Sequence, residues 1–475
     1  MAAVGSGVGI LGQVRRWATG LRTRRFDAAA GGRRWQGSQT FGAINAEIAA
    51  AAGPVRRRAG YYVRNNPWIA NGVSAIVSGA VGAGIKPQSQ HPDAAVRAAL
   101  HGRWSAWTET ADADGITDAY GLQALAVRAM VEAGECFANL LLTPDGLRIR
   151  LLDADMVPLD ETRELGDGRR VIQGVEFNAD GARAAYRVRR ERPEVPAFST
   201  ELVRIDADAM AHLFAPLAPG QVRGISWLAP VLLRLHELDL YEDAQLVRQK
   251  VSALFAGFVF DASGTATGFD GVNVNGVLTS GLEPGTLKVL PPGFDIKFSD
   301  PAEIGDAVDF IKLQLRSVAA GLGVPEYLLT GDLSQANYSS LRAALVEFRT
   351  RLEQLQYSVI VHQLCRPIWR AWILGEVLAG RLVGDLDELL AVEWITPAQP
   401  WVDPQKDAEA ARLQLAAGLT SRRRVVASQG WDVEQLDAEI AADHAREREL
   451  GLTFGEPTPG APTVRSIPRK DRDAA

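Results

Sequence analysis

Apolar residues recur at intervals of three and four along much of the chain, which is the spacing of amphipathic helices. We therefore expect helices over residues 66–80, 94–107, 120–133, 227–256 and 303–320. A further apolar stripe runs from residue 341 towards residue 374. Pro367 lies inside it, and we expect a kink there because proline lacks a backbone donor.

Between residues 136 and 214 the apolar period shortens to that of a β-strand. FANLLL and LRIRLL flank a Pro-Asp-Gly turn at 144–146, and VIQGVEF and ARAAYRV flank an Asn-Ala-Asp-Gly turn at 178–181. Both arrangements predict hairpins. Residues 257–301 hold eight glycines and several Val/Phe pairs, which predicts a small β-rich insertion between two helices.

The helix expected at 303–320 has one charged side. Asp306 and Asp309 lead and Lys312 and Arg316 follow, an order that the helix dipole favours, and this side must face water or a solvated channel. The next segment, GLGVPEYLLTGDLSQANYSS, contains Gly, Pro, Asp, Ser and Asn, so it should be a long loop.

The C-terminal part predicts three short helices over about residues 404–448. Asp403 and Pro404 form a helix start, Gly418 suits a helix end, and Asp432 opens the last helix. The Arg-rich segment 1–40 and the Pro-rich tail are expected to be disordered. A chain of 475 residues is too long for one core, so we expect an α+β protein of several regions.

Composition narrows the possible partners. The net charge of −6 argues against a large basic face that grips nucleic acid, so a DNA partner would have to slide rather than stick. Cys136 and Cys365 lie in apolar helical patterns and predict buried free thiols in a reducing compartment. Residues 68–85 are uncharged, but four glycines favour a buried helix and a turn over a bilayer span.

No motif predicts catalysis. The Gly-rich stretch 79–84 is followed by Ile-Lys-Pro, which lacks the Lys-Ser/Thr of a phosphate loop. His362 and Cys365 form a lone pair without the other ligands of a zinc site. Paired acids at 112/114, 153/155 and 206/208 fit turns and helix caps. We therefore expect no catalytic residue, no metal and no cofactor.

Four longer strings resemble the lambda-type portal proteins of tailed bacteriophages. They are VRNNPWIANGVSAIVSGAVGAGIKPQ, HLFAPLAPGQVRGISWLAPVL, GVPEYLLTGDLSQANYSSLRAAL and PWVDPQKDAEAARLQLAAGLTSRRRVVASQGWD, in this order. Together they cover about residues 60–450.

The resemblance implies a ring subunit, in dodecamers, with a multi-region portal fold. Its parts would be a flexible basic arm (1–40), a mixed α/β wing (41–227), two stem helices (228–256 and 302–322) around a β-rich clip (257–301), a tunnel loop (323–340), a kinked wing helix with a return strand (341–402), a helical crown (403–450) and a disordered tail (451–475).

The resemblance also implies the task and the partners. The ring would be the DNA gate at one capsid vertex of the virion, assembled in the bacterial host cytoplasm. It would pass double-stranded DNA without reading its sequence, and would bind the terminase large subunit, head-completion or adaptor proteins and the major capsid protein, but no membrane.

The resemblance also suggests candidate DNA-channel residues. A ring of twelve copies at −6 each carries a net charge of −72, so we expect an acidic channel that repels DNA, with a few local basic or polar contacts. The candidates are Lys312, Arg316, Asp332, Ser334, Gln335, Asn337 and Tyr338. A purely structural role explains these residues about as well as DNA contact does. Lys312 and Arg316 would then be ordinary charges at a helix end, and Asp332 and Asn337 would form turns. Another structural ring or connector protein of the virion, or a hydrolytic enzyme with scattered His and Asp residues, are the alternative functions.

Overall fold

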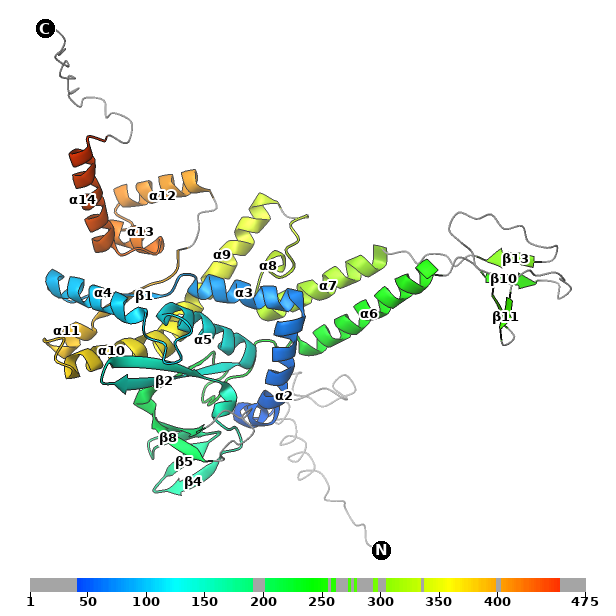
Figure 1. Ribbon diagram of the computed structural model, residues 1–475, viewed down its shortest axis with the longest axis horizontal. Coiled ribbons are helices and arrows are strands. Elements are labelled where there is room, and N and C mark those ends of the chain that lie inside the picture. Colours follow the sequence, from blue (N-terminus) through cyan, green and yellow to red (C-terminus); the bar gives the residue numbers. More distant parts are fainter. Residues whose placement is uncertain are drawn as a thin grey trace, which may run out of the picture. The chain divides into compact units, whose positions relative to one another are not determined.

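The computed structural model describes the larger part of the chain (Figure 1). The described residues are 41–190, 201–254, 258–261, 272–274, 277–279, 294–297, 305–334, 337–398 and 403–452. The expectations for the arm 1–40, for the tail from residue 453 and for Gln335 lie outside them.

Between residues 44 and 133 the chain is mainly helical: the helices expected at 66–80, 94–107 and 120–133 are confirmed, and one helix before them, Ile44–Asn65, was not predicted. The helices are α2 (Ile44–Asn65), α3 (Pro67–Val81), α4 (Ala94–Thr108) and α5 (Ala119–Ala133). Side-chain oxygens of Asn66, Asp93 and Asp118 accept the first free backbone N–H groups of α3, α4 and α5. The Gly-rich turn after α3 is confirmed: Gly82 has φ 47°, and a Cβ on Gly84 would lie 2.2 Å from the Tyr120 ring.

Two antiparallel sheets follow. Their strands are β2 (Glu135–Thr143), β3 (Gly146–Leu152), β4 (Arg163–Gly166), β5 (Arg169–Ile172), β6 (Val175–Phe177), β7 (Arg183–Arg189), β8 (Leu202–Asp206) and β9 (Met210–Phe214), with short helical turns η3 (Ala154–Met156) and η4 (Ala207–Ala209). One sheet has the order β3-β2-β9 and the other β4-β5-β6-β7-β8.

Both predicted hairpins are confirmed, with one correction. β2 pairs with β3 across the Pro-Asp-Gly turn, and β6 pairs with β7. VIQGVEF, expected as one strand, is β5 and β6 joined by a tight turn, because Gln173 and Gly174 both take positive φ (52° and 81°) and reverse the chain.

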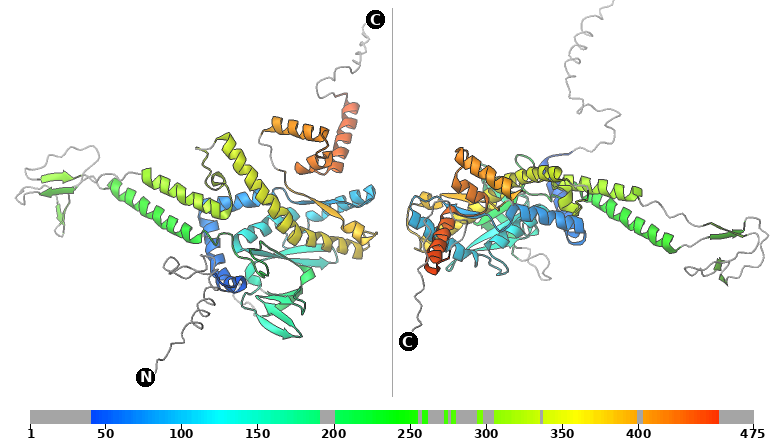
Figure 2. Two further views of the ribbon diagram at one scale, coloured as in Figure 1. Left: turned by 180° about the vertical axis from the view of Figure 1, so that it is seen from behind. Right: turned by 90° about the horizontal axis from the view of Figure 1, so that it is seen from above.

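Two helices lie side by side after the sheets, α6 (Leu232–Leu254) and α7 (Gly305–Leu322) (Figures 1 and 2). Arg234 Nη1 donates to Gln314 Oε1 at 2.6 Å, and the Tyr241 and Phe310 rings are 4.8 Å apart. The helix expected from residue 227 begins at Leu232, because Pro230 cannot donate to a preceding helical turn.

The β-rich insertion between α6 and α7 is described only in short pieces. These are β10 (Phe258–Asp261), β11 (Val272–Val274), β12 (Val277–Thr279) and β13 (Phe294–Lys297). β10 pairs with β13 and β11 with β12, both antiparallel, in agreement with the expected β character.

The expectation of one long loop after α7 is wrong. A short helix, α8 (Glu326–Thr330), follows Pro325, and Gly331 ends it in the left-handed conformation (φ 73°). Its apolar Leu329 is 1% exposed, so burial stabilises a turn of helix that the neighbouring Gly and Pro residues do not predict. The next helix, α9 (Tyr338–Leu355), begins inside the segment expected as loop.

The long apolar stripe is helical throughout, but its irregularity lies before the proline. α9 passes into a π-helical segment, η5 (Gln356–Cys365), and α10 (Arg366–Leu378) carries Pro367 in its first turn. The run is continuous there, since the Arg366 N–H donates to the Val361 carbonyl, and the wider π turns before Pro367 compensate for the backbone donor that proline lacks.

The remainder of the chain forms one strand pair and four helices among the described residues. They are β1 (Lys86–Ser89) with β14 (Val392–Ile395), α11 (Leu386–Leu390), α12 (Pro404–Ala416), α13 (Arg422–Ser428) and α14 (Val433–Leu450). The three short C-terminal helices predicted from the sequence are confirmed. Asp403 caps α12 and Asp432 caps α14.

The main core joins α3, α5, the β3-β2-β9 sheet, the inner ends of α6 and α7, and the long helical run from α9 to α10. Four tryptophans, Trp104, Trp107, Trp369 and Trp372, pack with ring centroids 4.6–6.2 Å apart. No described helix is both long enough and apolar enough to cross a membrane.

The two cysteines are buried free thiols, as expected. Cys136, however, lies in strand β2 and not in a helix. Burial raises the pKa of Cys136 and of Cys365 to about 12, so neither is a thiolate near neutral pH.

Candidate functional site

The two candidate bases lie one helical turn apart on α7 and are both paired within the chain. Lys312 Nζ is 3.2 Å from Asp332 Oδ2, and Arg316 Nε donates to Glu326 Oε2 at 2.8 Å. Their side chains are 36% and 56% exposed. This side of α7 therefore presents neutralised ion pairs and not a free positive stripe.

Asp332 is fixed by the turn that follows α8. Its Oδ1 accepts the Ser334 backbone N–H at 2.9 Å, and its own N–H donates to Thr330 Oγ1 at 3.1 Å. Hydrogen bonds from the Ser334 side chain and backbone, and then from Lys312, lower the pKa of Asp332 to about 2. The carboxylate stays ionised near neutral pH and joins the turn to α7, so the structure brings Lys312, Asp332 and Ser334 together.

Asn337 has a structural role as the cap of α9. Its Oδ1 accepts the Ser340 backbone N–H at 2.9 Å, while its own N–H donates to Ser340 Oγ at 3.2 Å. Tyr338 is the first residue of α9. The structure does not gather Asn337 with Lys312 and Asp332 through any hydrogen bond or ion pair among the described atoms.

α8 is held against α3 by two residues that the sequence analysis did not single out. Asn71 Nδ2 donates to the carbonyl oxygens of Leu328 and Leu329 at 2.8 and 3.1 Å. A Cβ on Gly72 would lie 2.6 Å from Leu329 Cδ1, so glycine permits the close approach. Asn71 and Gly72 belong to the first of the four strings that resemble the portal family, and this resemblance was the only sequence feature that could have pointed to them.

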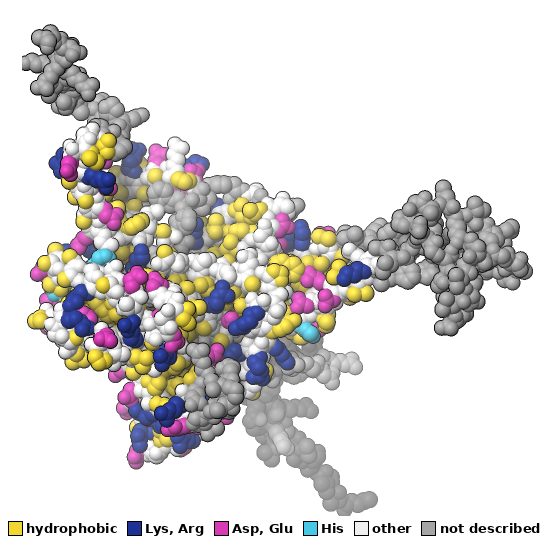
Figure 3. Space-filling view, viewed as in Figure 1, with side chains coloured by type: hydrophobic (Ala, Val, Ile, Leu, Met, Phe, Trp, Pro, Cys, Tyr) yellow, Lys and Arg dark blue, Asp and Glu magenta, His cyan; other side chains and the backbone are white. Residues whose placement is uncertain are grey.

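A groove of about 1130 Å³ runs between the α2–α3 junction and α6. Leu233 and Leu240, on its α6 wall, are 73% and 53% exposed, and Val247 continues their seven-residue spacing at 58% exposure. Figure 3 shows hydrophobic and acidic side chains adjoining one another over α6. Three large apolar residues in one row on an exposed helix indicate a surface that is covered in an assembly.

The groove also holds acidic side chains. Burial, together with the charge of Asp243, raises the pKa of Asp239, although Asn66 Nδ2 donates to its Oδ1 at 3.2 Å. Burial raises the pKa of Glu242 as well, and the charge of Asp239 adds to it. Since each residue turns a helix by 100°, Asp239 lies on the opposite side of α6 from Arg234 and Tyr241, whereas Glu242 lies about 90° from them.

A buried ionic cluster joins four distant parts of the chain. Glu135, at the start of β2, is 0% exposed and accepts from Arg223 Nη2 at 2.6 Å, from Arg56 Nη2 at 3.1 Å and from the Gly224 N–H at 2.9 Å. Burial alone would raise the pKa of Glu135, but the charge of Arg223 and hydrogen bonds from His212 and Arg223 outweigh burial and hold it well below its ordinary value.

The hydrogen bonds of His212 define its tautomer. Arg183 Nη1 lies 2.8 Å from His212 Nδ1, and an arginine can only donate, so Nδ1 accepts. Nε2 therefore carries the proton and donates to Glu135 Oε2 at 3.0 Å. Burial lowers the pKa of His212 to about 4, despite the neighbouring carboxylate. His212 is therefore neutral near pH 7, and the cluster is a buried structural network that exposes no acid–base pair to solvent.

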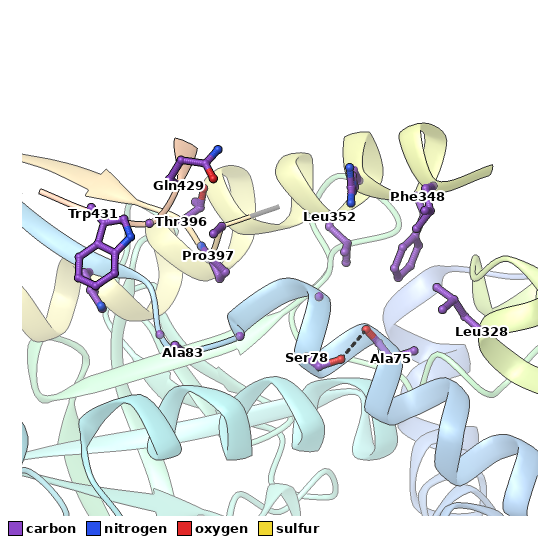
Figure 4. A pocket seen from close by; sticks show the side chains of 18 residues that line it. Ala75, Ser78, Ala83, Leu328, Phe348, Leu352, Thr396, Pro397, Gln429 and Trp431 are labelled. Atoms are coloured by element: carbon purple, nitrogen blue, oxygen red, sulfur yellow. Dashed lines mark hydrogen bonds between the residues drawn. The ribbon is translucent and has the colours of Figure 1, made fainter. Parts of the chain in front are cut away.

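A second cavity, of about 670 Å³, lies between the end of α3, α9 and the turn that joins α13 to α14 (Figure 4). Leu328, Phe348, Leu352, Pro397 and Trp431 are among its lining residues. It is lined by no acid, histidine or cysteine, and the described residues hold no group of three metal-ligating side chains. Among the described lining residues, the hydroxyl and amine groups are those of Ser78, Thr396 and Lys86, and no acid or histidine lines the cavity beside them.

Comparison with known proteins identifies relatives. A family model described as phage portal protein, lambda family, matches residues 31–356. A probable portal protein of Halomonas phage phiHAP-1 is 26% identical over 382 residues, which are 76% of this chain and 73% of that protein. Portal protein B of Escherichia phage lambda is 24% identical over 325 residues, 60% of each chain. The portal protein of Escherichia phage N15 is also 24% identical, over 61% of each chain.

Solved structures with some similarity come from a gene transfer agent particle. The neck of the native particle, computed with C12 symmetry, aligns at 16% identity with a TM-score of 0.46, over 81% of this chain and 97% of that one. The virion of the native particle aligns at 15% identity and the same TM-score, over 85% and 94%.

Proposed function

Because the chain belongs to the lambda family of phage portal proteins, we propose that it forms the ring-shaped DNA channel at one capsid vertex of a phage or phage-like particle. Twelve copies form the ring, and double-stranded DNA passes through it without sequence recognition during packaging, retention and ejection. The chain contributes structure and no catalytic step. The family match over residues 31–356, more than two thirds of the chain, is the observation that carries the proposal.

The surface of α6 supports ring formation. On one side α6 packs against α7 through Arg234 and Tyr241, and on the other it lines the open groove. The exposed row of Leu233, Leu240 and Val247 runs along the same helix. A helix with a partner on one side and an apolar, uncovered surface on the other suits a head-to-tail contact that repeats around a closed ring.

The proposal divides the chain as the family resemblance implies. α6 and α7 form the stem, β10–β13 belong to the clip, α8 and the following turn form the tunnel loop, and α12–α14 form the crown. The wing consists of the elements from α2 to β9 together with α9, η5, α10 and β14.

We place the DNA contacts on α7 and on the turn after α8, with Lys312, Arg316, Asp332 and Ser334 at the channel. Asn337 and Tyr338, at the start of α9, and Gln335, which lies outside the described residues, are further candidates. The two bases are neutralised by Asp332 and Glu326. A surface of paired charges supports sliding, because few counterions are released when DNA passes and affinity stays low. Backbone contacts of this kind carry no sequence information.

The partners in this proposal are the terminase large subunit, head-completion or adaptor proteins and the major capsid protein. Assembly takes place in the cytoplasm of a bacterial host, and the finished ring is part of the virion. These assignments rest on family membership and not on a described surface.

Charge reversal on α7 tests the channel assignment. Particles that carry Lys312→Glu with Arg316→Glu should package and retain less DNA than wild type, because acidic pairs then repel the phosphates. Arg351→Glu is the matched control: Arg351 is 57% exposed on α9 and pairs with Glu347 at 2.6 Å. DNA content per particle, measured after nuclease treatment, should fall only for the α7 variant, and equal DNA content in all three would refute the assignment.

A charge swap separates a DNA contact from a purely structural pair. Lys312→Asp combined with Asp332→Lys restores the attraction between the two positions but moves the positive charge onto the turn. Asp332→Lys alone is the control, because it loses the same acceptor for the Ser334 N–H but keeps Lys312. If the double variant retains less DNA than this control, position 312 acts on DNA. Full recovery would mean that Lys312 serves only to hold the turn.

A further inference from the structure

The three C-terminal helices bury no residue within a single chain. Every residue of α12, α13 and α14 is at least partly exposed. The large apolar side chains of Leu413, Leu419, Trp431 and Ile440 are 59%, 78%, 52% and 39% exposed. A helical unit of this size without a core is not stable by helix propensity alone, so its apolar side chains need cover.

The contacts between these helices and the remainder of the chain are mostly polar. Arg97 Nη2 lies 2.8 Å from Glu434 Oε1, Gln435 Nε2 lies 2.7 Å from His101 Nδ1, and Arg342 is 3.5 Å from Asp407. Ion pairs of this exposure orient the unit but stabilise it little. The required burial must come from elsewhere.

The helix geometry shows which sides are open. On α14, Glu434, Gln435 and Asp437 make the contacts within the chain. Glu434 and Gln435 contact α4, whereas Asp437 pairs with Arg422 of α13. At 100° per residue, Asp443 lies opposite Glu434, and Ile440 lies about 120° from Glu434 and about 140° from Gln435. On α12, Asp407 makes the contact within the chain, and Arg412 lies roughly opposite to it, with Leu413 beside it.

We propose that in the ring the open side of α14 packs against the open side of α12 of the neighbouring copy. This inference rests on the proposed ring, since rotation about the ring axis brings the two different sides together at each boundary. The helical unit then acquires its core between copies and not within one. Ile440 and Leu413 contribute apolar contact, and Arg412 faces the acids of α14.

Charge complementarity favours a second copy as the occupant. α14 carries six acidic and two basic residues. Arg412 on α12 is 78% exposed, and its acidic neighbour Glu409 lies as far as 3.9 Å away. The tail of the same chain is a poor alternative, because residues 453–475 contain only Phe454, Val464 and Ile467 as large apolar residues and four prolines.

Hydrogen exchange of the full-length protein tests the inference. Rings and any unassembled fraction are separated by size, and the amides of α12 and α14 are followed by mass spectrometry. Exchange in α14 should be slower by about tenfold or more in rings, because local opening then requires breaking contacts with the neighbour. Equal exchange in rings and monomers would overturn the inference while leaving the ring itself intact. The absence of rings would instead overturn the proposed function.

Variants identify the surface. Ile440→Asp and Leu413→Asp change exposed residues, so each chain should fold and form rings, but α14 should exchange at the monomer rate. Leu378→Asp is the control, at a residue that is 75% exposed at the end of α10. A chain that ends at residue 452 should keep the slow exchange in rings. Loss of protection on this truncation would show that the tail covers the helices, and would refute the second copy as occupant.

Discussion

Replacing Glu135 with Gln should destabilise the chain strongly although the side chain keeps its size. Glu135 is fully buried and accepts hydrogen bonds from Arg223, Arg56, His212 and the Gly224 backbone. The amide removes the negative charge but leaves the guanidinium of Arg223, which is 0% exposed, without compensation. Breaking a buried ion pair from one side costs about 3–5 kcal/mol.

Urea unfolding followed by tryptophan fluorescence, at fixed protomer concentration, measures this cost. Glu161→Gln is the matched control, because Glu161 pairs with Arg163 at 2.7 Å near the surface and should cost at most about 1 kcal/mol. The reasoning is refuted if Glu135→Gln is no more destabilising than Glu161→Gln.

A double replacement distinguishes lost charge balance from lost packing. Glu135→Leu with Arg223→Met removes both members of the closest pair and keeps the volume apolar. It should be more stable than Glu135→Leu alone by about 2 kcal/mol or more, because no unpaired Arg223 charge remains. A double variant as unstable as the single one would mean that the shape of the cluster, not its charge balance, stabilises the fold.

Three further predictions follow from the same structure. Gly134→Ala should cost about 2–4 kcal/mol in urea unfolding, because Gly134 has φ 97° and its Cβ would lie 2.3 Å from the backbone carbon of Ile225; Gly115→Ala, with φ 67° and open space, should cost only about 1 kcal/mol. The folded pKa of His212 is about 4 against 6.5 for a free histidine, so the unfolded chain binds the proton first. The free energy of unfolding should therefore fall as pH drops from about 6.5 towards 4. His212→Gln should make this pH dependence shallower in urea titrations at pH 7 and pH 5. Leu240→Asp should leave the chain folded but unassembled in sedimentation velocity, while Leu378→Asp assembles as wild type; rings from Leu240→Asp would show that this row is not an interface.

Much of the helical fold could be predicted from the sequence because its signals are local. Asn66, Asp93 and Asp118 are capping residues placed directly before an apolar repeat, and the structure uses all three as caps. α8 escaped prediction because it consists of five residues, and its stability comes from Leu329 and its contact with α3, hundreds of positions away in the chain. Helix-starting and helix-ending residues in the local sequence do not predict a helix that is stabilised by tertiary burial.

The candidate site shows the same limit. The sequence singled out Lys312 and Asp332 separately, but their ion pair depends on the path of α8. The Glu135 cluster was missed because its members come from positions 56, 135, 212 and 223. A signal was present: Glu135 begins a mostly apolar strand, and such a charge needs a buried partner whose position only the fold reveals.

Electron microscopy of the purified full-length protein tests the central claim most directly. The account predicts closed rings with an open central channel, built from identical subunits in head-to-tail contact. A folded protein that remains monomeric at high concentration, and forms no annulus in particles, would contradict it.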